Sequence, residues 1–225
     1  MDQDTIRKVA DATKAVAETS DTALKLAGKF GSHFSGPLGT IAKLMDNELQ
    51  FIAATRSVRL SDKWNAILAA RGQTIPTRHI PPNFVVPLLT TAVLEEDDDL
   101  QDTWARMLVN AGDASTEMEL RVAYVEILKG MSAFDVKNLA AMAEASLAIQ
   151  PGHPRALLTT DLPKSAERFP GHFAKDPSIS REMGISLANL SRLGCAIPAG
   201  GFDGAILYTI MTVTGLGLAL YQACS

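Results

Sequence analysis

The sequence has few of the residues that build disulfide frameworks or metal centres, with 2 cysteines and 4 histidines in 225 residues. Cys195 and Cys224 are too few for a disulfide framework, and Cys195 is expected to be a small core residue. His153 and His172 lack the helical spacing of zinc ligands, so solvent-facing loops are expected for both. The N-terminus also lacks the charged, apolar and small-residue succession of a signal peptide, which predicts a cytoplasmic protein.

Positive charge is scarce in the middle of the chain. The net charge is −4, and residues 73–150 hold five Lys and Arg residues against twelve Asp and Glu residues. Nucleic-acid binding needs clustered positive charge to neutralise phosphates. The middle of the chain is therefore disfavoured as a nucleic-acid surface.

Only one long stretch is free of charge, residues 204–224. Its length could span a bilayer, which makes a membrane segment one interpretation. However, β-branched and aromatic residues precede Thr214, whereas helix-forming Leu and Ala residues follow it. This change of composition favours a strand followed by a short helix.

Residues 1–72 predict an N-terminal helical hairpin. A weakly apolar helical pattern covers residues 3–30, glycines and Pro37 interrupt it, and a second pattern runs from Ile41 toward Gly72. An amphipathic hairpin that brings residues 20–55 to a membrane is the alternative. Packing on the protein or on a second copy is favoured, because the polar faces carry both charge signs.

An acidic segment stands at the centre of the chain, with six carboxylates between positions 95 and 102. Adjacent carboxylates do not converge on one ion as alternating loop ligands do, and no feature buries one of them selectively. Acids in the first turn of a helix stabilise it, so a helix start is predicted here, with Trp104 on the apolar face and a stop at Gly112. A partner-binding face remains open, and its candidate residues are Glu95, Glu96, Asp97, Asp98, Asp99 and Trp104.

Residues 73–148 predict a central helical unit of about four short helices. Prolines hold the chain extended at Pro81 and Pro82, so the first of these helices is expected to begin only close to Pro87. Ser132 and Asp135 resemble a capping box at the start of the last helix. Five prolines in residues 149–180 then predict a long connection without regular structure.

Residues 181–225 predict a winged-helix-like α/β element, with the order helix, strand, glycine-rich turn, strand, helix. Such an element could place its first helix in the DNA major groove. Arg181 and Arg192 are the candidate nucleic-acid-binding residues. Because tight DNA binding needs several cations, contact with a protein partner is favoured over DNA.

Five blocks occur in the order, and at about the spacing, typical of the bacterial abortive-infection alpha family: "IPPNFVVPLL", "LEEDDDLQDTWARMLVNAGD", "ILKGMSAFDVKNL", "LANLSRLGCAI" and "YTIMTVTGLGLALYQAC". The second block resembles the family's acidic stretch before Leu-x-x-x-Trp-Ala-x-Leu-Leu, with Met107-Leu108 in place of Leu-Leu. The resemblance covers most of residues 36–224. It implies a role in phage defence, in which an infected cell stops growing or dies before phage is released, and it brings no catalytic residues.

Together these features predict a mainly α-helical phage-defence protein without catalytic residues, cofactor or metal. It is expected to act through a protein partner, self-association or a membrane. A winged-helix regulatory protein that binds DNA or a partner protein is the alternative.

Overall fold

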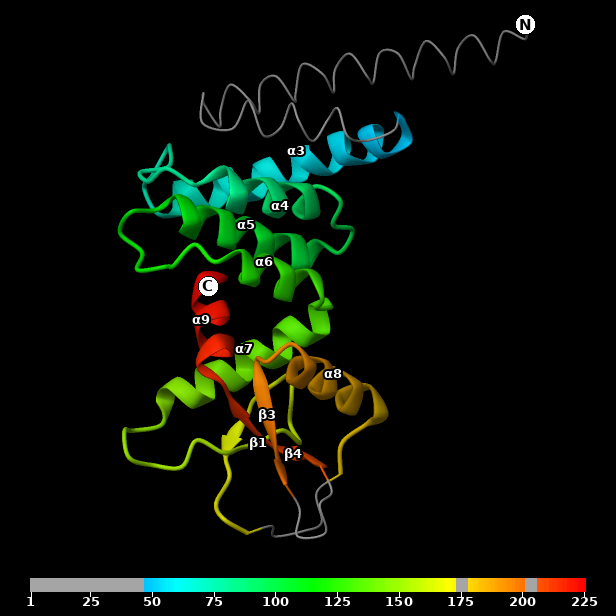
Figure 1. The fold of residues 1–225 in the computed structure, drawn as a ribbon, viewed down its shortest axis with the longest axis vertical. Coiled ribbons are helices and arrows are strands. Elements are labelled where there is room, and N and C mark those ends of the chain that lie inside the picture. Colours follow the sequence, from blue (N-terminus) through cyan, green and yellow to red (C-terminus); the bar gives the residue numbers. More distant parts are fainter. Residues whose placement is uncertain (1–46, 173–177, 201–205) are drawn as a thin grey trace, which may run out of the picture. The chain divides into compact units, whose positions relative to one another are not determined.

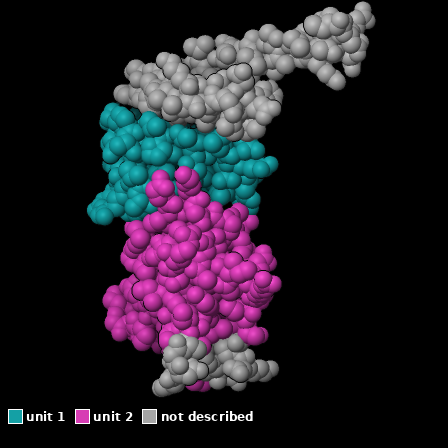
Figure 2. All heavy atoms as spheres, turned by 45° about the vertical axis from the view of Figure 1, so that its right-hand side comes forward, with its two compact units in different colours: residues 1–125 teal, residues 126–225 magenta. Residues whose placement is uncertain are grey.

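The structure is a computed structural model that describes residues 47–172, 178–200 and 206–225 (Figure 1). These residues form seven helices and a four-stranded antiparallel sheet, so the prediction of a mainly helical fold is confirmed. The first helix of the predicted hairpin lies outside the described residues. The chain divides into two compact units, residues 1–125 and 126–225 (Figure 2).

The first unit contains α3 (Asn47–Ala70), α4 (Pro82–Ala92) and α5 (Asp98–Gly112). α3 and α4 both pack against α5. The helices bury their bulky apolar side chains against one another, including Leu60, Trp64, Leu68, Phe84, Leu88, Trp104 and Leu108. The predicted stop at Gly72 is confirmed, because this glycine has the positive φ of 68° that often follows a helix.

The prediction that a helix begins only close to Pro87 is wrong. α4 begins at Pro82, directly after Pro81, which is extended and precedes the first turn. A proline at the first helical position loses no hydrogen bond, because that N–H has no partner within the helix. Pro87 lies inside α4, and the apolar face of Phe84, Leu88 and Leu89 is buried, which favours the helix through burial of apolar surface.

α6 (Val122–Lys129) follows, and the division between the two units falls within it. α7 (Ala133–Ala148) therefore belongs to the second unit, whereas the sequence pattern had grouped it with the central helices. The predicted capping box at its start is confirmed. Ser132 Oγ accepts from the backbone N–H of Asp135, and the Asp135 carboxylate accepts from the backbone N–H of Ser132 at 2.8 Å.

The second unit is built around a sheet with the strand order β2-β1-β4-β3. β1 (Leu157–Leu158) and β2 (Glu167–Arg168) lie in the segment that was predicted to lack regular structure, and that prediction is corrected here. Leu157 is fully buried and pairs with Met211. Two-residue strands are too short to show the alternation by which a strand is predicted.

The remaining elements are α8 (Arg181–Arg192), β3 (Ala196–Gly200), β4 (Ile206–Val213) and α9 (Gly215–Ala223). The predicted order of helix, strand, strand and helix is thus present, and residues 201–205 of the turn lie outside the described part of the chain. α8 packs on α7 and β3, and α7 also contacts α9 and β4.

The strand-and-helix interpretation of residues 204–224 is confirmed. β4 ends at Val213, and Thr214 caps α9 by accepting from the N–H of Gly217 at 2.9 Å. A Cβ atom at Gly217 would lie 2.1 Å from the carbonyl oxygen of Cys195, so only glycine fits this approach of helix to strand. Among the helices of the described residues, none is both long enough and apolar enough to cross a bilayer.

Cys195 is buried, as the sequence predicted, and burial raises the pKa of its thiol to about 11. A thiol with so high a pKa is almost entirely protonated at neutral pH and is a poor nucleophile. His153 and His172 are both exposed, which confirms their predicted place in solvent-facing segments. Within residues 47–172, 178–200 and 206–225, no group of three or more side chains could hold a metal ion.

Candidate functional sites

The acidic segment starts α5, as predicted. The Asp97 carboxylate accepts from the backbone N–H of Leu100 at 2.9 Å and caps the helix, with Asp98 and Asp99 in the first turn. Negative charge at this position is favourable, because the first N–H groups of a helix carry partial positive charge. Glu95 turns back on the chain, where its carboxylate accepts from the N–H groups of Glu96 and Asp97.

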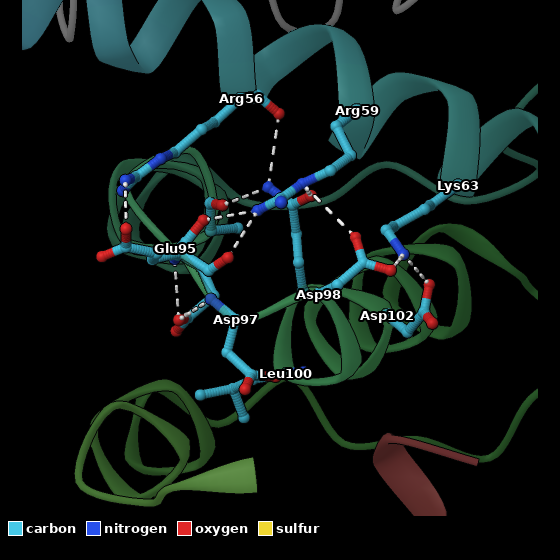
Figure 3. Close-up of polar contacts among 11 residues, drawn as sticks. Arg56, Arg59, Lys63, Glu95, Asp97, Asp98, Leu100 and Asp102 are labelled. Carbon is cyan, nitrogen blue, oxygen red and sulfur yellow. Dashed lines mark hydrogen bonds and ion pairs between the residues drawn. The ribbon is translucent and has the colours of Figure 1, made fainter.

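Three cations of α3 reach over this segment (Figure 3). Arg59 Nη2 donates to the carbonyl oxygens of Glu95 at 2.8 Å and Glu96 at 3.2 Å. Lys63 Nζ lies 2.6 Å from Asp102 Oδ1 and 3.1 Å from Asp98 Oδ2. Arg56 donates to the carbonyl oxygen of Leu94 and pairs with the Glu96 carboxylate at 3.6 Å. These contacts, between Arg56, Arg59 and Lys63 on one side and residues 94–102 on the other, are called the clasp below.

Gln101 closes the buried end of the clasp. Its side chain is fully buried, its Nε2 donates to the carbonyl oxygens of Ala92 at 3.1 Å and Arg56 at 3.3 Å, and its Oε1 accepts from Arg59 Nε. Burial by itself lowers the pKa of Lys63, but the hydrogen bonds and charges of Asp102 and Asp98 outweigh it. The pKa of Lys63 is therefore raised, and the ammonium group stays charged.

The predicted partner-binding residues divide into two groups. The Glu96 side chain is 88% exposed and that of Asp98 is 65% exposed, so both stay accessible although each has a cation nearby. Trp104 is 0% exposed. It belongs to the core of the first unit, which corrects its assignment to a partner-binding face, because no partner can reach a fully enclosed side chain.

A second candidate site is an open groove of about 640 Å³ between α7 and α8. It combines apolar, charged and hydrogen-bonding side chains, namely those of Ser132, Phe134, Asp135, Arg181, Glu182, Ile185, Ser186 and Asn189. Ile185 is 60% exposed, although it is a large apolar residue. The groove therefore presents apolar surface to solvent next to polar groups, as protein contact surfaces do.

The floor of this groove is a connected set of hydrogen bonds around Asp135. Its carboxylate accepts from the hydroxyls of Ser132 and Ser186 and from Asn189 Nδ2 at 3.0 Å, in addition to the N–H of Ser132. Asn138 Nδ2 in turn donates to Ser186 Oγ at 2.9 Å. Both carboxylate oxygens of Asp135 are thus engaged, which fixes α7 to α8 and holds the walls of the groove.

Arg181 and Arg192 stand at the two ends of α8, and both are exposed. They are eleven residues apart, which is close to three full helical turns, so they lie on one face of α8 about 16 Å apart along its axis. Arg181 lines the groove, and Arg192 Nη2 donates to Asn189 Oδ1 at 2.7 Å. The structure thus brings both predicted residues to the same helix face.

Sequence reasoning missed both the clasp and the groove. The clasp joins residues that are 35 to 40 positions apart, and the bonds from Asp135 to α8 join residues more than 50 apart. The spacing of Arg56, Arg59 and Lys63, which places them on one side of a helix, was the available signal for the clasp. For the groove the signal was weaker. Asp135 already has a predicted role in the capping box with Ser132, so its presence did not indicate contacts with α8.

Comparison with protein families gives one match, and it covers both units. The model of the family described as abortive infection alpha matches residues 55–224. The chain belongs to this family. The match begins one residue before Arg56 and extends through α9, so the clasp and the α7–α8 groove both lie within the region that characterises the abortive infection alpha family. Comparisons with curated proteins and with solved structures found no match.

Proposed function

We propose that this chain defends bacteria against phage by abortive infection, and that it acts in the cytoplasm by binding a protein partner rather than by catalysis. The match to the abortive infection alpha family over residues 55–224 carries the proposal. Within this family role, an infected cell would stop growing or die before phage is released, and the population would be protected.

The α7–α8 groove supports action through binding. Its one buried carboxylate, Asp135, accepts hydrogen bonds on both oxygens and is held as a support for the groove walls. The accessible part of the groove includes Ile185, the partly buried Phe134 and the charged residues Arg181 and Glu182. Apolar surface flanked by charge is suited to contact with another protein.

The first experiment measures phage plating efficiency and the survival of infected cells at high multiplicity, in cells that express the chain and in cells with an empty vector. Fewer plaques together with death or arrest of the infected cells supports abortive infection. Plaques that fall while infected cells survive and divide would contradict it. Equal plating across a broad phage panel would contradict any defence role under those conditions.

A pair of matched variants tests the groove. Ile185→Asp places a charge on its apolar wall, whereas Ile197→Asp makes the same change at a residue that is also 60% exposed and lies on β3. We expect the first variant to lose protection and the second to keep it, with equal expression and equal melting temperatures. Equal protection by both variants would remove the groove from the proposal.

DNA binding is the second candidate function, and one observation favours it. Arg181 and Arg192 lie on the same face of α8, within an element that has the order helix, strand, strand and helix. Two phosphate contacts predict that raising salt from about 50 to 200 mM weakens binding about tenfold. A gel shift at low salt with Arg181→Gln and Arg192→Gln as controls tests this, and no shift at low salt would exclude DNA.

A further inference from the structure

The attachment of α3 to the first unit combines one apolar and one ionic contact. The apolar contact consists of Leu60, Trp64 and Leu68, which are 2 to 3% exposed. The ionic contact is the clasp. Within the described residues, the covalent connection of α3 to the rest of the unit is at its C-terminal end, where Gly72 has a φ of 68°. The clasp lies in the middle of α3 (Asn47–Ala70), next to the apolar contact.

All the acceptors of the clasp belong to one short segment. Arg56, Arg59 and Lys63 contact carbonyl oxygens at residues 94–96 and carboxylates at residues 96–102. Within it, Glu96 contacts both Arg56 and Arg59, and Asp98 contacts both Arg59 and Lys63, so neighbouring cations share partners. Networks of charges with a shared partner contribute more than isolated surface pairs, which are individually weak.

The charges of the clasp do not balance. Residues 95–102 hold six carboxylates, whereas three cations of α3 face them, so the acids outnumber these cations two to one. Without the α3 cations, six carboxylates would repel one another across a short segment. The α3 cations reduce this repulsion, which couples the two elements.

We propose that the clasp is an electrostatic latch. While the cations of α3 are paired with residues 94–102, α3 stays packed on α5. When the pairing is broken, α3 separates from α5 while α4 and α5 stay folded, and Trp64 becomes exposed. The latch is a property of the purified chain, so it is tested independently of the proposed role in phage defence.

The test uses the full chain with Asp98→Asn and Asp102→Asn, which neutralise both carboxylates that contact Lys63 and leave the helix cap Asp97 intact. The control is the chain with Glu117→Gln and Glu119→Gln, which makes the same charge change in the same unit and breaks an exposed pair with Arg121. Trypsin cleavage after Lys63 reports release of α3, and cleavage after Arg106 of α5 reports unfolding of the unit.

We expect cleavage after Lys63 to be about tenfold faster in the clasp variant, because cleavage of a transiently opened segment follows the opening equilibrium. The variant loses three ion pairs, Arg59–Asp98, Lys63–Asp98 and Lys63–Asp102, which together shift this equilibrium by about this factor. Cleavage after Arg106 should stay at the wild-type rate. In the control variant, the rate of cleavage after Lys63 should also equal the wild-type rate. Equal rates for the clasp and control variants, or a parallel rise at Lys63 and Arg106, would overturn the latch.

Fluorescence gives a second measurement. The chain has two tryptophans, so Trp104→Phe leaves Trp64 as the single reporter. In this background, acrylamide quenching of Trp64 should increase on adding the clasp substitutions and increase further with salt, because salt screens exposed charges. Quenching that stays at the level of the unmodified background at every salt concentration would contradict release of α3.

Discussion

Replacing Trp104 with alanine tests the assignment of this residue to the core. Trp104 is 0% exposed and is the largest of the fully buried side chains. Truncating a large aromatic residue removes its transfer free energy and leaves a cavity that neighbouring side chains fill only in part. We expect the free energy of unfolding of the first unit to fall by about 4 kcal/mol.

The assay is urea unfolding followed by Trp64 fluorescence, since Trp64 lies on α3 of the same unit and remains in the variant. Trp104→Phe is the matched control. It keeps an aromatic ring and removes the indole N–H, which has no hydrogen-bond acceptor among the described residues. The free-energy cost of the lost volume is partly offset, because the variant no longer buries a donor without an acceptor. The free energy of unfolding of Trp104→Phe is therefore expected to fall by about 1 kcal/mol or less. A loss below about 1 kcal/mol for Trp104→Ala would refute the core assignment.

Three further predictions concern buried ionisable groups. Asp135→Ala should lower the stability of the second unit by about 3 kcal/mol in denaturation followed by circular dichroism, because it removes the capping box and leaves the buried Ser186 hydroxyl without its acceptor. The hydroxyl and N–H of Ser115 donate to Asp113 and hold the pKa of that carboxyl below its ordinary value. The contribution of the Asp113 carboxylate to the stability of the folded state should be complete above about pH 4 and should be lost as the pH falls through the folded pKa. Asp113→Asn should therefore reduce the fall in melting temperature at acid pH. Burial raises the pKa of the Cys195 thiol to about 11. The folded state should therefore lose stability relative to the unfolded state as the pH rises from about 9, because the unfolded thiol ionises first. At pH 8 a thiol reagent should label Cys224 first and Cys195 only after denaturation.

Features set by neighbouring residues were predictable from the sequence. The cap at Asp97, the stop at Gly112, the capping box at Ser132 and the change from strand to helix at Thr214 all depend on contacts within a few positions. Such contacts leave a pattern of residue types that elementary rules of helix capping and strand composition can interpret.

Features set by distant residues were not predictable. Pro81 and Pro82 argued for a start of α4 close to Pro87. Proline is tolerated at the first helical position, and burial of the apolar face favours continuation of the helix through Pro87. β1 consists of two residues, and its partners on β4, Met211 and Ile210, lie more than fifty positions away. The clasp and the groove also join distant residues. The spacing of the α3 cations indicates a charged helix face but does not identify the acidic segment as its partner, and no local pattern indicates the pairing of α7 with α8.

The position of β4 in the sheet has a consequence for synthesis of the protein. β4 lies between β1 and β3 and is made after both of them. During synthesis on the ribosome, the helices of the first unit can therefore pack together before β4 is made. Until then the sheet lacks one of its two inner strands, and Leu157 has no Met211 to pair with. A nonsense mutation before residue 206 is expected to leave a folded first unit joined to an open, aggregation-prone half of the second.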